Sequence, residues 1–216
     1  MLPTKLSKEQ TTDLDQWLRS LGRVRYGTSF IDGAERWTLW IDDYGRVGIE
    51  TAGKPVAQEV WITSRPESDD DEEYPQDNPF PQWAEEEERR ELQQALGYAP
   101  CYWIDISGAY RGSHVRQVIF RLAIWVARRF DCMIVMEDEV SPAELWPRTL
   151  GWSAGTTLPE AERREALQAY LRQFPGRALA MHNWIRPGYN TIWHLVDATF
   201  LEAWLQHIER STQFGF

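Results

Sequence analysis

The residues best suited to chemistry are a hydroxyl and three carboxylates on either side of a predicted helix. Asp105 and Ser107 end one apolar run, CYWIDIS, while Glu137 and Asp138 follow a second, CMIVM. Paired carboxylates hold Mg²⁺, and a small-residue loop before a helix N-terminus accepts phosphate oxygens. Ligands of open parallel sheets bind outside the carboxyl ends of the strands. These four residues are therefore candidates for Mg²⁺-dependent phosphoryl or nucleotide chemistry.

No established catalytic or cofactor motif surrounds these residues. The loop GAYRGS lacks the final lysine of a P-loop and the spacing of G-x-G-x-x-G, and a turn with a serine helix cap explains it equally well. The four histidines and two cysteines show no metal-ligand spacing. We expect Cys101 and Cys132 to be reduced core thiols, with a single disulfide as the alternative. The sequence predicts neither a metal nor a cofactor.

The charge of the chain is concentrated in one short segment. Residues 67–91 contain 12 of the 33 acidic residues and two of the 23 basic ones, so this segment carries the whole net charge of −10. A neutral body with one acidic stretch favours a basic protein partner and disfavours direct nucleic-acid binding. The acids expected to attract that partner are Asp69, Asp70, Asp71, Glu72 and Glu73. The aromatic residues expected to anchor it nearby are Tyr74, Phe80 and Trp83.

A second candidate surface follows from alternation in predicted strands. Trp37, Leu39 and Ile41 share one face of a strand, and Trp40 lies on the other face. Trp61 takes the corresponding position on a later strand. If a helix covers that face, both tryptophans are core residues. If solvent reaches it, they form an aromatic patch of the kind that protein partners use.

Periodicity in the first half of the chain predicts the elements that hold these residues. Ser7 and Gln10 form a capping box for a helix over residues 7–21. Alternating runs then predict an antiparallel meander, with strands at 24–31, 36–42, 46–51 and 57–63. Residues 65–82 are rich in Pro, Asp and Glu and predict an extended loop, followed by a helix at 83–96.

The second half predicts a strand at 101–107, a helix at 113–130 and a strand at 132–137. Their short connections indicate a right-handed βαβ crossover with parallel strands. A helix at 159–174, a strand at 178–185 and a last helix from residue 190 or 191 to about 208 follow. The sequence therefore predicts a single α+β domain over 1–216, with an antiparallel β-meander plus a βαβ unit, and helices covering the sheet or sheets. No apolar run spans a membrane and no secretory signal begins the chain, so we expect a cytoplasmic protein.

The run CYWIDISGAYRGSHVRQVIFRLAIWVARRFDCMIVMEDEVSPAELW combines a strand, a small-residue loop, a long helix, a strand ending in acids, and S-P-x-x-L-W. This pattern resembles segments of small bacterial immunity proteins from polymorphic-toxin systems. The resemblance covers 46 of the 216 residues and assigns no individual functional residue. It implies an α+β cytoplasmic protein, of a class often acidic and Trp-rich, that blocks a toxin by binding it.

The leading hypothesis is a non-enzymatic protein-binding protein, specifically an inhibitor or immunity protein for a basic partner such as a toxin or nuclease. One alternative is an enzyme that uses the βαβ edge with Asp105, Ser107, Glu137 and Asp138. The other is a structural subunit of a larger assembly. The sequence does not predict an oligomeric state.

Overall fold

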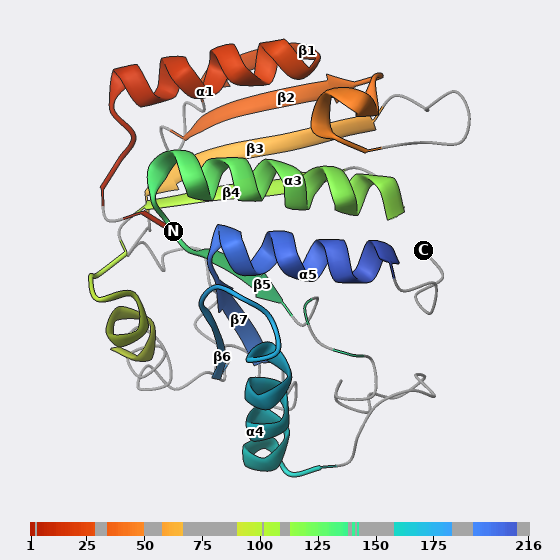
Figure 1. The fold of residues 1–216 in the computed structure, drawn as a ribbon. Coiled ribbons are helices and arrows are strands. Elements are labelled where there is room, and N and C mark those ends of the chain that lie inside the picture. Colours follow the sequence, from red (N-terminus) through yellow and green to blue (C-terminus); the bar gives the residue numbers. More distant parts are fainter. Residues whose placement is uncertain are drawn as a thin grey trace, which may run out of the picture. The chain divides into compact units, whose positions relative to one another are not determined.

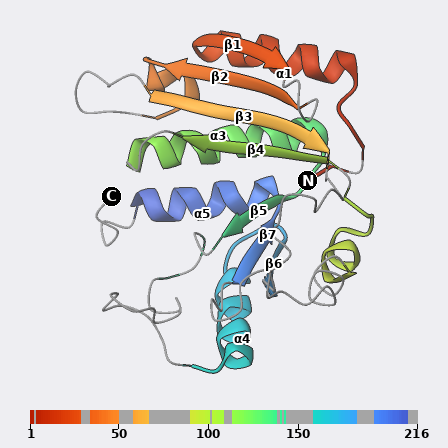
Figure 2. The same cartoon turned by 180° about the vertical axis from the view of Figure 1, so that it is seen from behind.

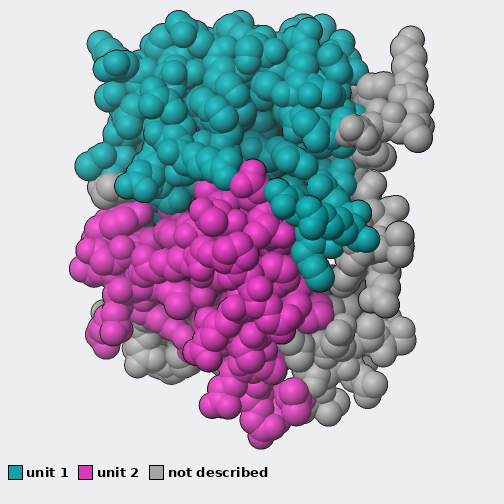
Figure 3. Space-filling model, viewed as in Figure 1, with its two compact units in different colours: residues 1–67, 100–132, 205–216 teal, residues 68–99, 133–204 magenta. Residues whose placement is uncertain are grey.

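The computed structural model describes residues 1–2, 4–28, 34–49, 58–66, 90–100, 102–108, 113–137, 140, 142, 158–182 and 192–210. The chain divides into two compact units (Figure 3). The first comprises Met1–Glu67, Pro100–Cys132 and Leu205–Phe216, and the second comprises Ser68–Ala99 and Met133–Trp204. Neither unit is contiguous in sequence, because the chain passes between them more than once. A single domain over the whole chain stays a prediction.

The first unit is built on a four-stranded antiparallel sheet. Its strands are β1 (Arg23–Thr28), β2 (Glu35–Ile41), β3 (Gln58–Pro66) and β4 (Tyr102–Gly108), and they lie side by side in chain order. Each strand pairs antiparallel with the next. The β-meander and the α+β class are therefore confirmed, although the strands of the meander differ in part from those predicted.

Two helices, α1 (Lys8–Leu21) and α3 (Ser113–Phe130), cover one face of this sheet. Figure 1 shows both helices in front of the strands, and Figure 2 shows the strands from the side that these helices leave uncovered. The predicted capping box is present, since Ser7 Oγ accepts from the Gln10 amide at 3.2 Å and Gln10 Oε1 accepts from the Ser7 amide at 2.8 Å. The core of this unit forms between helices and sheet, with Leu14, Leu18, Trp37, Leu39, Val60, Ile62, Val118 and Leu122 among its buried residues.

The predicted strand at 46–51 is wrong. Tyr44–Val47 form a 3₁₀ helix, η1, whose N-cap Asp43 accepts a hydrogen bond from the Gly45 amide at 3.1 Å. Gly48 ends this helix in the left-handed region, with φ of 71°. Tyr44 and Val47 are both buried, as expected for residues three apart on a 3₁₀ helix. The local turn chemistry of Asp43 and Gly48 therefore outweighs the weak alternation on which the strand was predicted.

The second unit contains a three-stranded sheet in the order β5 (Ile134–Glu137), β7 (Ile192–Val196), β6 (Ala178–His182), with both pairs antiparallel. Helix α4 (Glu160–Leu171) packs against β6. Helix α5 (Ala198–Arg210) follows β7 and begins in this unit. Residues 90–96 are also helical, which agrees with the end of the helix predicted at 83–96. None of the described helices is long and apolar enough to cross a membrane.

Two predictions for this half of the chain are wrong. Strands β4 and β5 flank α3 in sequence, but they belong to different sheets and pair only antiparallel, so these described strands form no parallel βαβ crossover. Residues 192–196, predicted to begin the last helix, form strand β7. Asp197, rather than Asn190 or Thr191, caps α5, because its Oδ1 accepts from the Phe200 amide at 2.7 Å.

Candidate functional site

The uncovered face of the four-stranded sheet, called the outer face below, combines aromatic and charged side chains. Trp37, Leu39 and Ile41 point to the core and are at most 1% exposed. Trp40 and Trp61 lie on the opposite side, as predicted, and Trp61 is 41% exposed. Strand alternation and register assign these further residues to the outer face: Arg23, Arg25, Arg36, Thr38, Glu59, Thr63, Trp103, Asp105 and Ser107.

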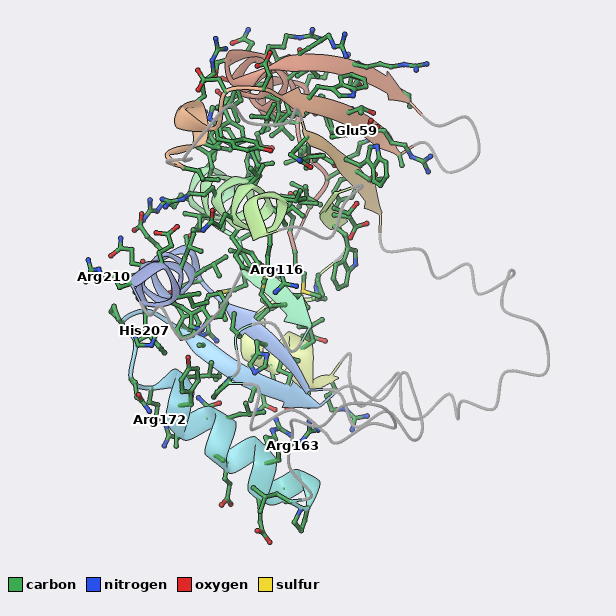
Figure 4. The ribbon with its side chains drawn as sticks, turned by 90° about the vertical axis from the view of Figure 1, so that its right-hand side faces the viewer. Glu59, Arg116, Arg163, Arg172, His207 and Arg210 are labelled. Carbon is green, nitrogen blue, oxygen red and sulfur yellow. The ribbon has the colours of Figure 1, made fainter. Side chains whose placement is uncertain are left out.

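Glu59 joins the two tryptophans of this face. Trp40 Nε1 donates to Glu59 Oε2 at 3.1 Å, and Trp61 Nε1 donates to Glu59 Oε1 at 2.8 Å. The register explains the contact, because Trp40 lies directly opposite Glu59 and Trp61 is two residues further along β3. Figure 4 shows Glu59 on the side of the sheet away from α3. Hydrogen bonds to an ionised acceptor are strong, so one carboxylate fixes the orientation of both indoles.

Arg23 completes this group, and Arg23, Trp40, Glu59 and Trp61 are called the Glu59 cluster below. The Arg23 guanidinium carbon lies 4.6 Å from the centre of the Trp40 ring, in cation–π contact. Arg23 begins β1 directly opposite Trp40. The preceding Gly22 permits this pairing, because a Cβ at residue 22 would lie only 2.2 Å from the Trp40 carbonyl oxygen. The turn from α1 into β1 therefore positions the cation.

The residues proposed for Mg²⁺ chemistry do not share a strand edge. Asp105 and Ser107 lie on β4 in the outer face, where Ser107 is directly opposite Trp61 and Asp105 opposite Thr63. Glu137 ends β5 in the other sheet, and Asp138 lies outside the described residues. The described sheets thus lack the parallel edge on which the enzymatic alternative depends. Among the described residues, no three His, Cys, Asp or Glu side chains are grouped as metal ligands.

The residues of the acidic segment predicted to bind a partner lie outside the described residues. They are Asp69, Asp70, Asp71, Glu72, Glu73, Tyr74, Phe80 and Trp83. Their place in the topology is nevertheless defined, because they follow β3 and precede β4. These strands are neighbours in the sheet, and the last residue of β3, Pro66, pairs with the first residue of β4, Tyr102. The acidic segment is therefore part of the connection between two strands of the outer face.

A buried basic pair in the second unit was not found from the sequence. His194 on β7 is fully buried, and Arg163 on α4 is 2% exposed and lies between α4 and the three-stranded sheet (Figure 4). The pKa of His194 is lowered to about 4, mainly by burial and then by the Arg163 charge, while the Met136 backbone acts in the opposite direction. His194 is therefore neutral at pH 7. Its place in the apolar run IWHLV was a signal of burial, but that run was assigned to a helix.

Cys132 has a free thiol, and burial raises its pKa. Cys101 lies outside the described residues. Because the thiol of Cys132 is free, the two cysteines do not form the disulfide that was the alternative prediction.

The model of a protein family described as a family of unknown function (DUF6368) matches residues 1–209, which is nearly the whole chain. No curated protein and no solved structure matches the chain. The resemblance of residues 101–146 to immunity proteins therefore stays a hypothesis.

Proposed function

We propose that this chain, which belongs to the family DUF6368, is a non-enzymatic protein-binding protein whose partner is basic. The observation that carries this proposal is the Glu59 cluster, in which one carboxylate holds two indoles on a sheet face that neither α1 nor α3 covers. Tryptophan is enriched among the residues that dominate binding energy, because it buries a large area and keeps one polar atom. Indoles already held in place lose little side-chain freedom when a partner binds.

The acidic segment supplies the long-range attraction in this proposal. Asp69, Asp70, Asp71, Glu72 and Glu73 attract a basic protein and raise its association rate. In the sequence, this segment lies between β3, which bears Trp61, and β4, which bears Asp105. Tyr74, Phe80 and Trp83 supply further apolar contacts from the same segment. In this proposal, the acidic segment supplies the attraction, and the outer face supplies the close contact.

In its most specific form, the proposal is an inhibitor or immunity protein that acts in the cytoplasm. It blocks a basic toxin or nuclease by covering the surface that the toxin needs. The resemblance of residues 101–146 supports this form, as does the net charge of −10. The absence of a parallel strand edge from the described sheets weakens the support for the enzymatic alternative.

Replacing the five acids, Asp69 to Glu73, with Asn and Gln tests this proposal. We expect the variant to associate more slowly with the partner and to show a flatter dependence of the association rate on salt, because opposite charges accelerate encounter mainly at low ionic strength. The partner is first captured from lysate of the source cell, with a variant that lacks residues 67–78 as the comparison. Purified components are then mixed at low and high salt, and the association rate constant is measured.

The matched control for this experiment replaces Glu162 and Glu165, two exposed acids on α4, with Gln. This control should keep most of the wild-type association rate and its salt dependence. If the variant with five substitutions kept the wild-type association rate constant at low salt, the acidic segment would not steer the partner. If the wild type captured only acidic proteins, the proposal that its partner is basic would be wrong.

A further inference from the structure

We propose that Trp61, with the Glu59 carboxylate bound to its indole, is a receptor for one arginine side chain of the partner. This inference rests on the proposed function and names the chemical group that the outer face recognises. Its basis is a contrast between the two tryptophans of the Glu59 cluster, one of which already carries a guanidinium.

Trp40 and Trp61 share one hydrogen-bond acceptor but differ in what lies over their rings. Both donate Nε1–H to the Glu59 carboxylate, one to each oxygen. The Arg23 guanidinium lies over the Trp40 ring, 4.6 Å from its centre. Over the Trp61 ring, the described part of the chain has no such cation, and this residue is 41% exposed. The cluster therefore repeats one aromatic–carboxylate arrangement, once filled by the chain's own arginine and once open to solvent.

The charges around Trp61 fit a cation. A carboxylate oxygen that accepts one hydrogen bond retains a second lone pair, so Glu59 can still accept from a partner. Asp105 lies on β4 diagonally across from Trp61, and diagonal neighbours in a sheet are about 7–8 Å apart. The directly opposite residues, Thr38 and Ser107, are neutral. Arg36 lies on the diagonal of the β2 side, and the Met1 amino group interacts with the charge of Asp105, so Glu59 is the carboxylate that faces the Trp61 indole directly.

Arginine fits this site better than lysine does. The guanidinium group is planar, and it stacks on an aromatic ring while its edge donates paired hydrogen bonds to a carboxylate. The lysine ammonium is a compact charge that holds its water more strongly and has no flat face to stack. Within this chain, the Arg23 guanidinium already lies over an indole ring of the Glu59 cluster, 4.6 Å from the ring centre of Trp40. The partner is therefore expected to present an arginine, rather than a lysine, to Trp61.

The direct test is a titration of the whole chain, with the tryptophan indoles labelled with ¹⁵N, against N-acetyl-arginine amide. The Trp61 indole signal is assigned by its loss in Trp61→Phe. We expect this signal to move in a saturable way with the arginine probe, and N-acetyl-lysine amide to bind at least about threefold more weakly. Sodium chloride at equal ionic strength controls for screening. Glu59→Gln should weaken the response to arginine, whereas Glu9→Gln, at an exposed carboxylate on α1, should leave it unchanged.

Two results would overturn the inference: no saturable movement of the Trp61 signal, or equal movement with the arginine and lysine probes. The outcome is separable from that of the proposed function. If Trp61→Ala still captures the basic partner and the arginine probe gives no response, the protein-binding function stands and the arginine receptor is wrong. If no basic partner is captured and the probe gives no response, both proposals fall.

Discussion

At the residue scale, Glu59 has the central position in the outer face. Its two oxygens accept from Trp40 and Trp61 at 3.1 Å and 2.8 Å, which leaves neither indole N–H of this pair without an acceptor. A tryptophan exposed on a sheet would otherwise satisfy its N–H with water and adopt several rotamers. The carboxylate removes that freedom before any partner arrives, and this is the physical reason for assigning a binding role to the face.

His194 gives the molecule a pH dependence that is independent of the outer face. Its pKa is about 4 in the folded chain, against 6.5 for an unperturbed histidine. Among the described residues, the Arg163 charge on α4 acts on it, whereas the residues paired with it on β5 and β6, Met136 and Ala180, are neutral. Protonation is therefore opposed by burial and by the neighbouring charge.

We predict that acid destabilises the fold through His194. Between pH 6.5 and pH 4, the unfolded histidine binds a proton and the folded one does not, so the contribution is fully present above pH 6.5 and declines as the pH falls toward 4. The whole decline is on the order of 3 kcal/mol. Urea unfolding of wild type and of His194→Phe, at about pH 7 and about pH 4.5, measures it. Equal slopes of stability against pH in the two proteins would contradict the prediction.

At the element scale, the edges of both sheets carry side chains that limit further pairing. Strand β1 forms one edge of the four-stranded sheet and carries Arg23 and Arg25. Strand β6 forms one edge of the three-stranded sheet, and α4 lies along it. Gln168 Nε2 donates to the Ala178 carbonyl and Gln168 Oε1 accepts from the Ala180 amide, both at 3.1 Å. This side chain thus takes the place of a neighbouring strand at β6.

We predict that Gln168→Ala destabilises the second unit by about 1–3 kcal/mol, because it leaves one carbonyl and one amide of β6 without their partner. Amide exchange at Ala180 should become faster in the variant, and urea unfolding should give the change in free energy. Gln173→Ala, at an exposed residue just beyond α4, is the matched control and should be close to neutral. If both substitutions have the same effect, Gln168 does not protect the strand edge.

The same scale shows which elements a sequence can predict. The helices at 7–21 and 113–130 are predicted nearly residue for residue, because capping and apolar periodicity are local properties. The βαβ crossover is wrong, since strand–helix–strand order in sequence is the same whether the strands are neighbours or lie in different sheets. The run IWHLV is wrong for another reason: a short apolar run fits a strand or a buried helix equally well.

At the scale of the whole molecule, the candidate site could be predicted only in part. Alternation placed Trp40 and Trp61 on the face opposite Trp37, and composition located the acidic segment. The contact of both indoles with Glu59 depends on the register that sets Trp40 opposite Glu59, and pairing between residues 19 positions apart is not a local property of the sequence. The acidic segment lies between β3 and β4 in the sequence, and only the strand order shows that these two strands are neighbours in the sheet.

The charge distribution and the outer face both support the proposal of a binding protein with a basic partner. The segment 67–91 carries the net charge, and in the proposed function it acts over a distance, whereas the Glu59 cluster acts on contact. Long-range attraction changes mainly the association rate, and well-packed aromatic contacts change mainly the dissociation rate. Substitutions in the two regions should therefore affect different rate constants of the same complex.

The most direct test of this account compares two exposed apolar residues of nearly equal exposure, Trp61 at 41% and Leu158 at 42%. Trp61→Ala and Leu158→Ala are each titrated against the purified basic partner, and the dissociation constant is measured. We expect Trp61→Ala to weaken binding by at least about tenfold through faster dissociation, and Leu158→Ala to bind almost as the wild type does. Equal dissociation constants for the two variants would contradict the assignment of the outer face as the binding surface.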